Sequence, residues 1–204
     1  FYIHARHGCR VLGISTSARG IELANRESRR RGLDGAVQFR VADGCDNGLP
    51  NGAFDVAWVM ESSHLMHDKK KLFRECFWVL KSGGTLLLCD IMLMRILPFH
   101  RELALYSANA VKYLRLMRAF GNARVNSPGT YCNGLIEAGF REVTTVDITE
   151  KTIPTLRHWR ENAFGRPGCD TGQLYGKEIG RFIRGTEILE EFFLAGIFGY
   201  SLLR

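Results

Sequence analysis

The sequence predicts an α/β fold in which a doubly wound, mostly parallel sheet has an antiparallel edge strand and carries a helical cap. Short apolar runs alternate with amphipathic helical stretches over the first two thirds of the chain, and this alternation is typical of a parallel sheet covered on both faces. The connections between these elements are short, about two to six residues, as in most such units. After residue 90 the pattern changes to a long stretch rich in methionine and aromatic residues, with helical spacing and no strand signature, which predicts the cap.

Each core element has a local signal. Gly8 follows the end of a short helix and Gly32 the end of a longer one, where glycine supplies the left-handed conformation of a C-cap. Residues 81–84 form a turn with two glycines between a helix and a buried strand. The last two strands are expected to pair antiparallel at the sheet edge. We expect strands over residues 10–14, 37–41, 54–60, 85–89, 142–149 and 193–203, and helices over 18–31, 69–80, 91–120, 128–138 and 154–190.

The length of the chain suits one core with an appended cap, because 204 residues are too few for two independent domains of ordinary size. The expected organisation is a core over 1–90, cap parts over 91–126 and 150–190, a core helix and strand over 127–149, and a final core strand over 191–204.

The composition is that of a globular protein, with 46% hydrophobic and 24% charged residues. No apolar run approaches the roughly 20 residues that a membrane span needs, so no membrane partner is expected. The six cysteines are scattered and form no CxxC pair or Cys/His pattern, so we expect no metal site. Cysteines inside apolar runs are typical of reduced, buried thiols, which favours a cytoplasmic protein.

The net charge of +7 raises the question of nucleic-acid binding, since clustered cations gain affinity by releasing counterions from phosphates. The two basic clusters are Arg29–Arg31 at the end of one expected helix and Lys69–Lys71 at the start of another. Charge runs at such positions are usually solvated faces, and no nucleic-acid-binding signature accompanies them. We therefore expect no nucleic-acid partner.

Polar residues follow three of the expected strands. Ser15 and Thr16 follow the first, Asp43 and Gly44 the second, and Glu61 the third. Because right-handed crossovers place the carboxyl ends of parallel strands at one edge, these residues are expected at the edge where open α/β sheets bind ligands. A carboxylate such as Asp43 accepts hydrogen bonds from an adenine amine or a ribose hydroxyl, but a turn aspartate before glycine explains it equally well.

His64 and Asp90 form a second candidate site. His64 comes after the third of these strands and Asp90 ends the next one, so neighbouring parallel strands would bring both side chains to one edge. An imidazole, with an ordinary pKa of roughly 6.5, removes a proton from a hydroxyl, and a carboxylate holds its tautomer and stabilises the charged ring. The alternative is a buried histidine with a structural role, and the other five histidines are given that interpretation.

Six short runs occur in a recognisable order and spacing. They are Val41-Ala42-Asp43-Gly44, Leu49-Pro50, Phe54-Asp55-Val56-Ala57-Trp58, Glu61-Ser62-Ser63-His64, Leu80-Lys81-Ser82-Gly83-Gly84 and Leu88-Cys89-Asp90. Together they resemble class I S-adenosylmethionine (SAM)-dependent methyltransferases from natural-product pathways. The resemblance is nearest to sugar O-methyltransferases of the rebeccamycin type and more distant to tocopherol, sarcosine and cyclopropane-synthase relatives. It covers residues 1–149 and the final strand near 197–200.

The resemblance implies a Rossmann-like fold, with SAM as the methyl donor and S-adenosylhomocysteine as its product. It implies Asp43 and Gly44 at the adenine, Ser15 and Thr16 near the ribose, and Glu61 in the cofactor pocket. His64 and Asp90 fall where the rebeccamycin-type enzymes have a catalytic histidine and aspartate. The cap would cover the substrate, with an apolar lining that includes Met92, Met94, Tyr106, Trp159 and Phe164.

The sequence departs from the family pattern at three places. The first strand and the glycine-rich loop that wrap the methionine part of SAM are expected to be missing from the chain as given, because Phe1 falls in the helix that follows them. Ser15 stands where many relatives carry an acid for the ribose hydroxyls, and Gly20 where closer ones carry glutamine. Ser82 replaces the usual proline of its turn.

The leading interpretation is O-methylation of a small, largely apolar natural product, with His64 as the general base. Alternatives are methylation of an isoprenoid or aromatic carbon, N-methylation, or a methyltransferase-like binding module without catalysis. A nicotinamide-dependent dehydrogenase is disfavoured because no acidic residue ends the second strand. The expected partner is a small-molecule substrate, and a homo-oligomer is left open.

Overall fold

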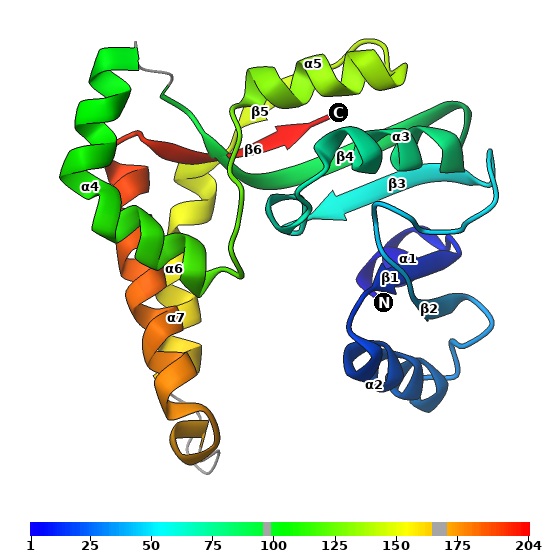
Figure 1. Ribbon diagram of the computed structural model, residues 1–204. Helices are drawn as coiled ribbons and strands as arrows, with labels where there is room; N and C mark the ends of the chain where they lie inside the picture. Colours follow the sequence, from blue (N-terminus) through cyan, green and yellow to red (C-terminus); the bar gives the residue numbers. More distant parts are fainter. Residues whose placement is uncertain (96–98, 165–170) are drawn as a thin grey trace.

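The computed structural model describes the backbone of residues 1–95, 99–164 and 171–204, and their side chains except those of 99–108, 163–164, 171–175 and 177–179. Figure 1 shows helices on both sides of a twisted set of strands and a separate group of helices beyond the strand ends. The first half contains α1 (Tyr2–His7), β1 (Val11–Ser15), α2 (Ala18–Arg30), β2 (Val37–Val41), β3 (Phe54–Met60), the 3₁₀ turn η1 (Ser63–Leu65) and α3 (Lys69–Val79). The second half contains β4 (Leu80–Leu93), α4 (Phe99–Ala119), α5 (Pro128–Ala138), β5 (Thr145–Asp147), α6 (Thr149–Phe164), α7 (Thr171–Leu194) and β6 (Phe198–Leu203).

The strands form two hydrogen-bonded ladders. β1 pairs parallel with β2, and a four-stranded sheet has the order β3-β4-β6-β5. β3 and β4 are parallel, whereas β6 is antiparallel to both β4 and β5. The expected antiparallel pairing of the last two strands is therefore confirmed, with β5 at the edge of the sheet. In Figure 1 the β1–β2 ladder lies beside β3, with α1 and α2 next to it.

Local signals explain where the core helices begin and end. The Ser17 hydroxyl accepts a hydrogen bond of 3.1 Å from the Gly20 amide at the start of α2, and the Asp68 carboxylate accepts one of 2.9 Å from the Lys71 amide at the start of α3. Each such cap stabilises its helix by about 1 kcal/mol. Gly8 ends α1 in the left-handed conformation, with φ of 65°, as expected from its position.

The bounds of several elements differ from the prediction. β4 begins at Leu80, so residues 81–84, expected as a turn before a strand at 85, belong to the strand, and the pairing with β3 shifts register between Phe54 and Val56. The single helix expected over 154–190 is two helices, α6 and α7.

β4 continues through Leu93, past the boundary expected at residue 90, because residues 88–93 pair with β6. The strand expected over 142–149 is only three residues long, since the Asp147 side chain accepts a hydrogen bond of 2.9 Å from the Thr149 amide and turns the chain into α6. Pro154 lies inside α6 rather than at its start, and β6 begins at Phe198 rather than near 193 because α7 extends to Leu194.

The buried apolar side chains that the structure describes form two clusters. The first lies between the sheet and helices α3 and α5, and the second joins the ends of β4 and β6 to α4, α6 and α7. Met92 belongs to the first cluster and is fully buried, so its expected place in the cap lining is wrong. Met94 packs against the same cluster, and Trp159 packs in the second, where its ring lies 6.0 Å from that of Phe182.

The side chains of Tyr106 and Phe164, also expected in the cap lining, lie outside the described residues. Within the part of the chain that the structure describes, no helix combines the length and the hydropathy that a membrane crossing requires.

Candidate active site

The strand pairing places the predicted site residues in two groups at the carboxyl ends of the strands. In the first ladder Ser15 pairs with Val41, so Thr16 and Asp43 follow adjacent strand ends. In the second, Met60 pairs with Cys89, so Glu61 and Asp90 follow directly from paired residues.

Contacts between the segments after β2 and before α3 bring the two groups together. The Gly44 backbone packs against the Met66 side chain, which immediately follows η1. The Asn47 amide donates a hydrogen bond of 3.0 Å to Glu75 of α3, and the Cys45 thiol lies 3.6 Å from the Asp68 carbonyl. The loop that carries Asp43 therefore adjoins the turn that carries His64.

His64 and Asp90 form a buried pair, as the sequence predicted. His64 Nδ1 lies 2.7 Å from Asp90 Oδ1, and the His64 backbone amide donates a hydrogen bond of 2.9 Å to Asp90 Oδ2. Asp90 is fully buried and His64 is 7% exposed. Because Nδ1 is engaged by the carboxylate, Nε2 is the ring nitrogen left to take a proton.

Among the residues that the structure describes, four donors surround the Asp90 carboxylate. Besides the two groups of His64, the Ile91 amide donates a hydrogen bond of 2.8 Å to Oδ1, and the Ser63 hydroxyl donates to Oδ2. Burial by itself raises the pKa of Asp90, but the hydrogen bonds and charge of His64, together with the Ser63 hydroxyl, outweigh burial and lower that pKa. Asp90 is thus held as an anion in the interior.

The site contains two residues to which the sequence interpretation gave no role. Ser63 and Tyr131 are both buried, and their hydroxyl oxygens lie 2.8 Å apart. Ser63 directly precedes His64 in the run of polar residues that follows β3. Tyr131 comes from α5, about 40 residues beyond β4, and no local pattern connects it to the site.

Lys69 departs from the solvated role expected for its cluster. Its ammonium group donates hydrogen bonds to the backbone carbonyls of Ser63 at 2.5 Å, Met66 at 2.7 Å and Arg124 at 3.4 Å. Burial lowers the pKa of Lys69, and a nearby Asp90 charge partly opposes this effect. Lys69 therefore ties the His64 turn to the chain that follows α4.

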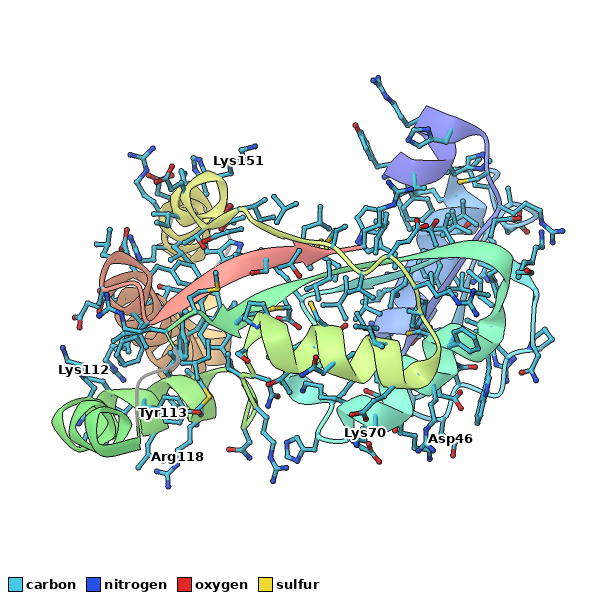
Figure 2. All side chains as sticks on the ribbon, turned by 90° about the horizontal axis from the view of Figure 1, so that it is seen from above. Asp46, Lys70, Lys112, Tyr113, Arg118 and Lys151 are labelled. Atoms are coloured by element: carbon cyan, nitrogen blue, oxygen red, sulfur yellow. The ribbon has the colours of Figure 1, made fainter. Side chains whose placement is uncertain are left out.

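The other two lysines of the cluster match the expectation. The Lys70 side chain is 74% exposed and pairs with Glu137 at 2.9 Å, and Lys71 lies 3.7 Å from Asp46. Figure 2 shows Lys70 and Asp46 at the periphery of the molecule.

Glu61 is held at the end of β3 in an unusual conformation. Its φ of 48° is in the left-handed region, and its amide donates a hydrogen bond of 2.9 Å to the Cys89 carbonyl. Its Oε1 accepts a hydrogen bond of 2.9 Å from the Tyr200 hydroxyl. Burial, followed by the Glu61 carboxylate, raises the pKa of Tyr200, so the tyrosine keeps its proton and remains a donor.

The remaining predicted residues are accessible. Ser15, Thr16 and Asp43 are exposed at their strand ends. Asp43 Oδ1 accepts a hydrogen bond of 2.8 Å from the Cys45 amide, while Oδ2 has no partner among the described residues. Asp43 therefore forms the turn that the alternative interpretation required and still presents an acceptor of the kind that an adenine amine or a ribose hydroxyl needs.

Gly44 has a packing explanation. A Cβ atom at this position would lie 2.7 Å from Met66 Cε and 3.1 Å from Met66 Sδ. A side chain at this position would displace the flexible end of Met66, so packing favours glycine here independently of any ligand. Among the residues that the structure describes, no group of three or more His, Cys, Asp or Glu side chains is arranged to hold a metal ion.

Comparison with known proteins finds sequence similarity to methyltransferases. Residues 1–88 match the family described as methyltransferase domain. The 27-O-demethylrifamycin SV methyltransferase of Amycolatopsis mediterranei is 32% identical over 145 residues, which cover 71% of this chain and 50% of that protein. Phosphoethanolamine N-methyltransferase 1 of Arabidopsis thaliana is 30% identical over 157 residues, covering 77% of this chain and 29% of that protein. The chain thus spans half or less of these relatives.

Solved structures show the same fold. The geranyl diphosphate C-methyltransferase of Streptomyces coelicolor A3(2), in complex with Mg²⁺, geranyl diphosphate and S-adenosylhomocysteine, superposes with a TM-score of 0.73 at 24% identity, covering 99% of this chain and 65% of that one. The [4+2]-cyclase SpnF superposes with a TM-score of 0.76 at 22% identity, and the match covers 99% of this chain and 68% of SpnF. The predicted Rossmann-like α/β fold is confirmed by these superpositions.

Proposed function

On the premise that residues 1–88 are a methyltransferase domain, we propose that this protein is a SAM-dependent methyltransferase that acts on a hydroxyl oxygen of a small molecule, with His64 as general base. The observation that carries the proposal is the buried His64–Asp90 pair at the carboxyl ends of β3 and β4. The relatives that match include O-, N- and C-methyltransferases, and the base is what favours oxygen among these three acceptors.

The chemistry requires a base because a hydroxyl loses its proton when its oxygen is methylated. SAM, when bound, supplies an electrophilic methyl group to the acceptor oxygen. His64 takes the hydroxyl proton on Nε2, and the ionised Asp90 stabilises the imidazolium that results. Alignment of the acceptor and exclusion of water complete the requirements of an in-line displacement.

The accessible polar residues at the strand ends fit a nucleoside-type cofactor. Asp43 Oδ2 is available to the adenine amine, and the hydroxyls of Ser15 and Thr16 are available to the ribose. We assign Glu61 to the wall of the same pocket, and Gly44 to the adenine contact, where its packing against Met66 shapes the loop. Helices α4, α6 and α7 are proposed to cover the acceptor.

We further place the acceptor among largely apolar natural products, in keeping with a rebeccamycin-type sugar O-methyltransferase. This finer assignment is supported by the relative that methylates a demethylrifamycin, a natural product with a free hydroxyl. The N- and C-methylating relatives define the alternatives that an experiment has to separate.

Transfer of label from methyl-labelled SAM tests the proposal with three acceptors of different chemistry. 27-O-demethylrifamycin SV offers a hydroxyl, phosphoethanolamine an amine, and geranyl diphosphate an alkene carbon. We expect transfer to the hydroxyl acceptor, and calorimetric binding of S-adenosylhomocysteine without any acceptor. Transfer only to the amine or the carbon would overturn the assignment to oxygen.

A second candidate function is small-molecule binding or rearrangement without methyl transfer. It is favoured by the fold shared with SpnF, which is a cyclase. Binding of S-adenosylhomocysteine with no transfer to hydroxyl, amine or carbon acceptors would support this candidate against the first.

A further inference from the structure

We propose that Ser63 and Tyr131 are positioning residues for the His64–Asp90 pair, acting as a chain of donors from Tyr131 through Ser63 to the Asp90 carboxylate. The proposal rests on the proposed function, because the chain matters for activity only if His64 acts as a base. Neither residue is expected to touch the acceptor or the cofactor.

The direction of the chain follows from counting protons. An ionised carboxylate only accepts hydrogen bonds, so the contact between Ser63 Oγ and Asp90 Oδ2 uses the single proton of the serine hydroxyl. The 2.8 Å contact between Ser63 Oγ and the Tyr131 hydroxyl must then use the tyrosine proton. Burial raises the pKa of Tyr131 above its ordinary value of about 10, so the hydroxyl keeps that proton at neutral pH.

Because the donor chain is buried, the loss of one of its hydrogen bonds has a large effect on Asp90. Ser63, Asp90 and Tyr131 have exposed fractions of 0%, 0% and 1%. Water cannot readily replace a donor that is lost at such a site, so Asp90 Oδ2 would keep only the His64 backbone amide as a donor. In a chain of donors each hydrogen bond also polarises the next, so the Tyr131 hydroxyl strengthens the bond that Ser63 makes to Asp90.

The donor chain from Tyr131 through Ser63 to Asp90 links three elements that are distant in sequence: α5, η1 and β4. The Tyr131 ring is held in turn by Phe73 of α3, at a centroid distance of 5.5 Å. Gly134, one turn further along α5, allows this packing, because a Cβ there would lie 2.6 Å from the Phe73 ring. Packing within the first apolar cluster therefore fixes the position of the Tyr131 hydroxyl.

Several charged or titratable groups influence the Asp90 carboxylate from the surrounding elements. They are His64 of η1, Lys69 of α3, Tyr131 of α5, Cys89 of β4 and Tyr200 of β6, and the Glu61 carboxylate acts on Cys89 and Tyr200 in turn. Ser63→Ala changes none of these side chains chemically and removes only the serine hydroxyl between Tyr131 and Asp90. A change in the titration of the pair in that variant therefore reports the loss of the serine donor.

The expected effect has a definite sign. A carboxylate that loses a donor becomes a better acceptor for the remaining ones, including the Nδ1 proton of His64. The protonated form of the pair is then stabilised, so the apparent midpoint of its coupled titration rises. Ser63→Ala is expected to raise this midpoint by about half a pH unit or more. Tyr131→Phe should raise it less, because it removes only the polarising donor.

The titration is measured by side-chain ¹⁵N NMR of the histidines in the purified protein, with His64 assigned by comparison with His64→Gln. This readout needs no acceptor. Ser28→Ala is the matched control: Ser28 is also fully buried, but its hydroxyl donates a hydrogen bond of 2.5 Å to the Val37 carbonyl in the other ladder. We expect this control to lower the melting temperature without moving the His64 midpoint.

An unchanged midpoint in both Ser63→Ala and Tyr131→Phe would overturn the proposal. Should Ser63→Ala fail to fold, Tyr131→Phe alone decides, because it preserves the ring packed against Phe73. A raised midpoint in a protein that transfers no methyl group would reject the proposed function and leave the donor chain intact. When label transfer has identified a hydroxyl acceptor, kcat with that acceptor is expected to fall about tenfold in Ser63→Ala, while KM for SAM stays the same.

Discussion

The Tyr200 hydroxyl donates a hydrogen bond of 2.9 Å to Glu61 Oε1, which joins the antiparallel strand β6 to the residue that ends β3. Tyr200 also pairs with Ile91 of β4 through the sheet. The bond therefore bridges across β4 and holds a carboxylate whose backbone is already in the left-handed region.

If Glu61 lines the cofactor pocket, Tyr200→Phe should weaken the binding of S-adenosylhomocysteine about threefold to tenfold. The physical reason is the loss of one hydrogen bond that orients the carboxylate, worth about 1 kcal/mol. Calorimetry measures the affinity. Tyr2→Phe is the control, because Tyr2 is 75% exposed. Equal affinities in both variants would argue against a role for Glu61 at the cofactor.

His64→Ala removes the proposed base without disturbing the predicted cofactor residues. Turnover with a hydroxyl acceptor should fall about a hundredfold or more, while the affinity for S-adenosylhomocysteine stays within about twofold of the wild type. The measurement is label transfer alongside calorimetry. Full turnover in this variant would remove His64 from the mechanism.

Asp90 gives stability a specific dependence on pH. Its pKa is lower in the folded chain than in the unfolded chain, so its contribution is fully present above an unfolded pKa of about 3.9 and is lost as pH falls through the folded value. Asp90→Asn should therefore lower the free energy of unfolding at pH 7 by about 3 kcal/mol. Urea unfolding at several pH values should show the difference between wild type and variant shrinking below about pH 4. A constant difference would contradict this account.

Lys69 and Lys70 are neighbours with opposite expected effects. Lys69→Met leaves three backbone carbonyls around the His64 turn without their common donor, and should destabilise the protein by about 1–3 kcal/mol. Lys70→Met removes only a surface ion pair with Glu137 and should change stability by less than about 0.5 kcal/mol. Denaturant unfolding of both variants makes the comparison, and equal losses would mean that Lys69 is as solvated as its neighbour.

Gly44→Ala tests the contact between the Asp43 loop and the turn after η1. The new methyl group would meet the end of the Met66 side chain, which is flexible, so we expect a moderate loss of about 1–2 kcal/mol. Gly35→Ala is the control, since nothing lies within 4 Å of a Cβ at that position. Thermal unfolding compares the two, and a loss in the control as large as that of Gly44→Ala would remove the packing explanation.

Local patterns were sufficient for most of the core. The strands β1, β2 and β3 and the helices α2, α3 and α5 lie within about one residue of their expected bounds, because apolar periodicity, N-caps and glycine C-caps are properties of neighbouring residues. The adjacency of His64 and Asp90 was also predictable, since parallel neighbouring strands bring their carboxyl ends together.

Long-range contacts settled what the amino-acid order left open. β4 runs on to Leu93 because β6 pairs with it, and so Met92 lies in the core and not in the cap. Lys69 binds the Arg124 carbonyl, more than 50 residues away, and Tyr131 reaches the Asp90 site from α5, about 40 residues beyond β4. These features depend on which distant segments pack together, and pairing of that kind leaves no periodic trace in the chain.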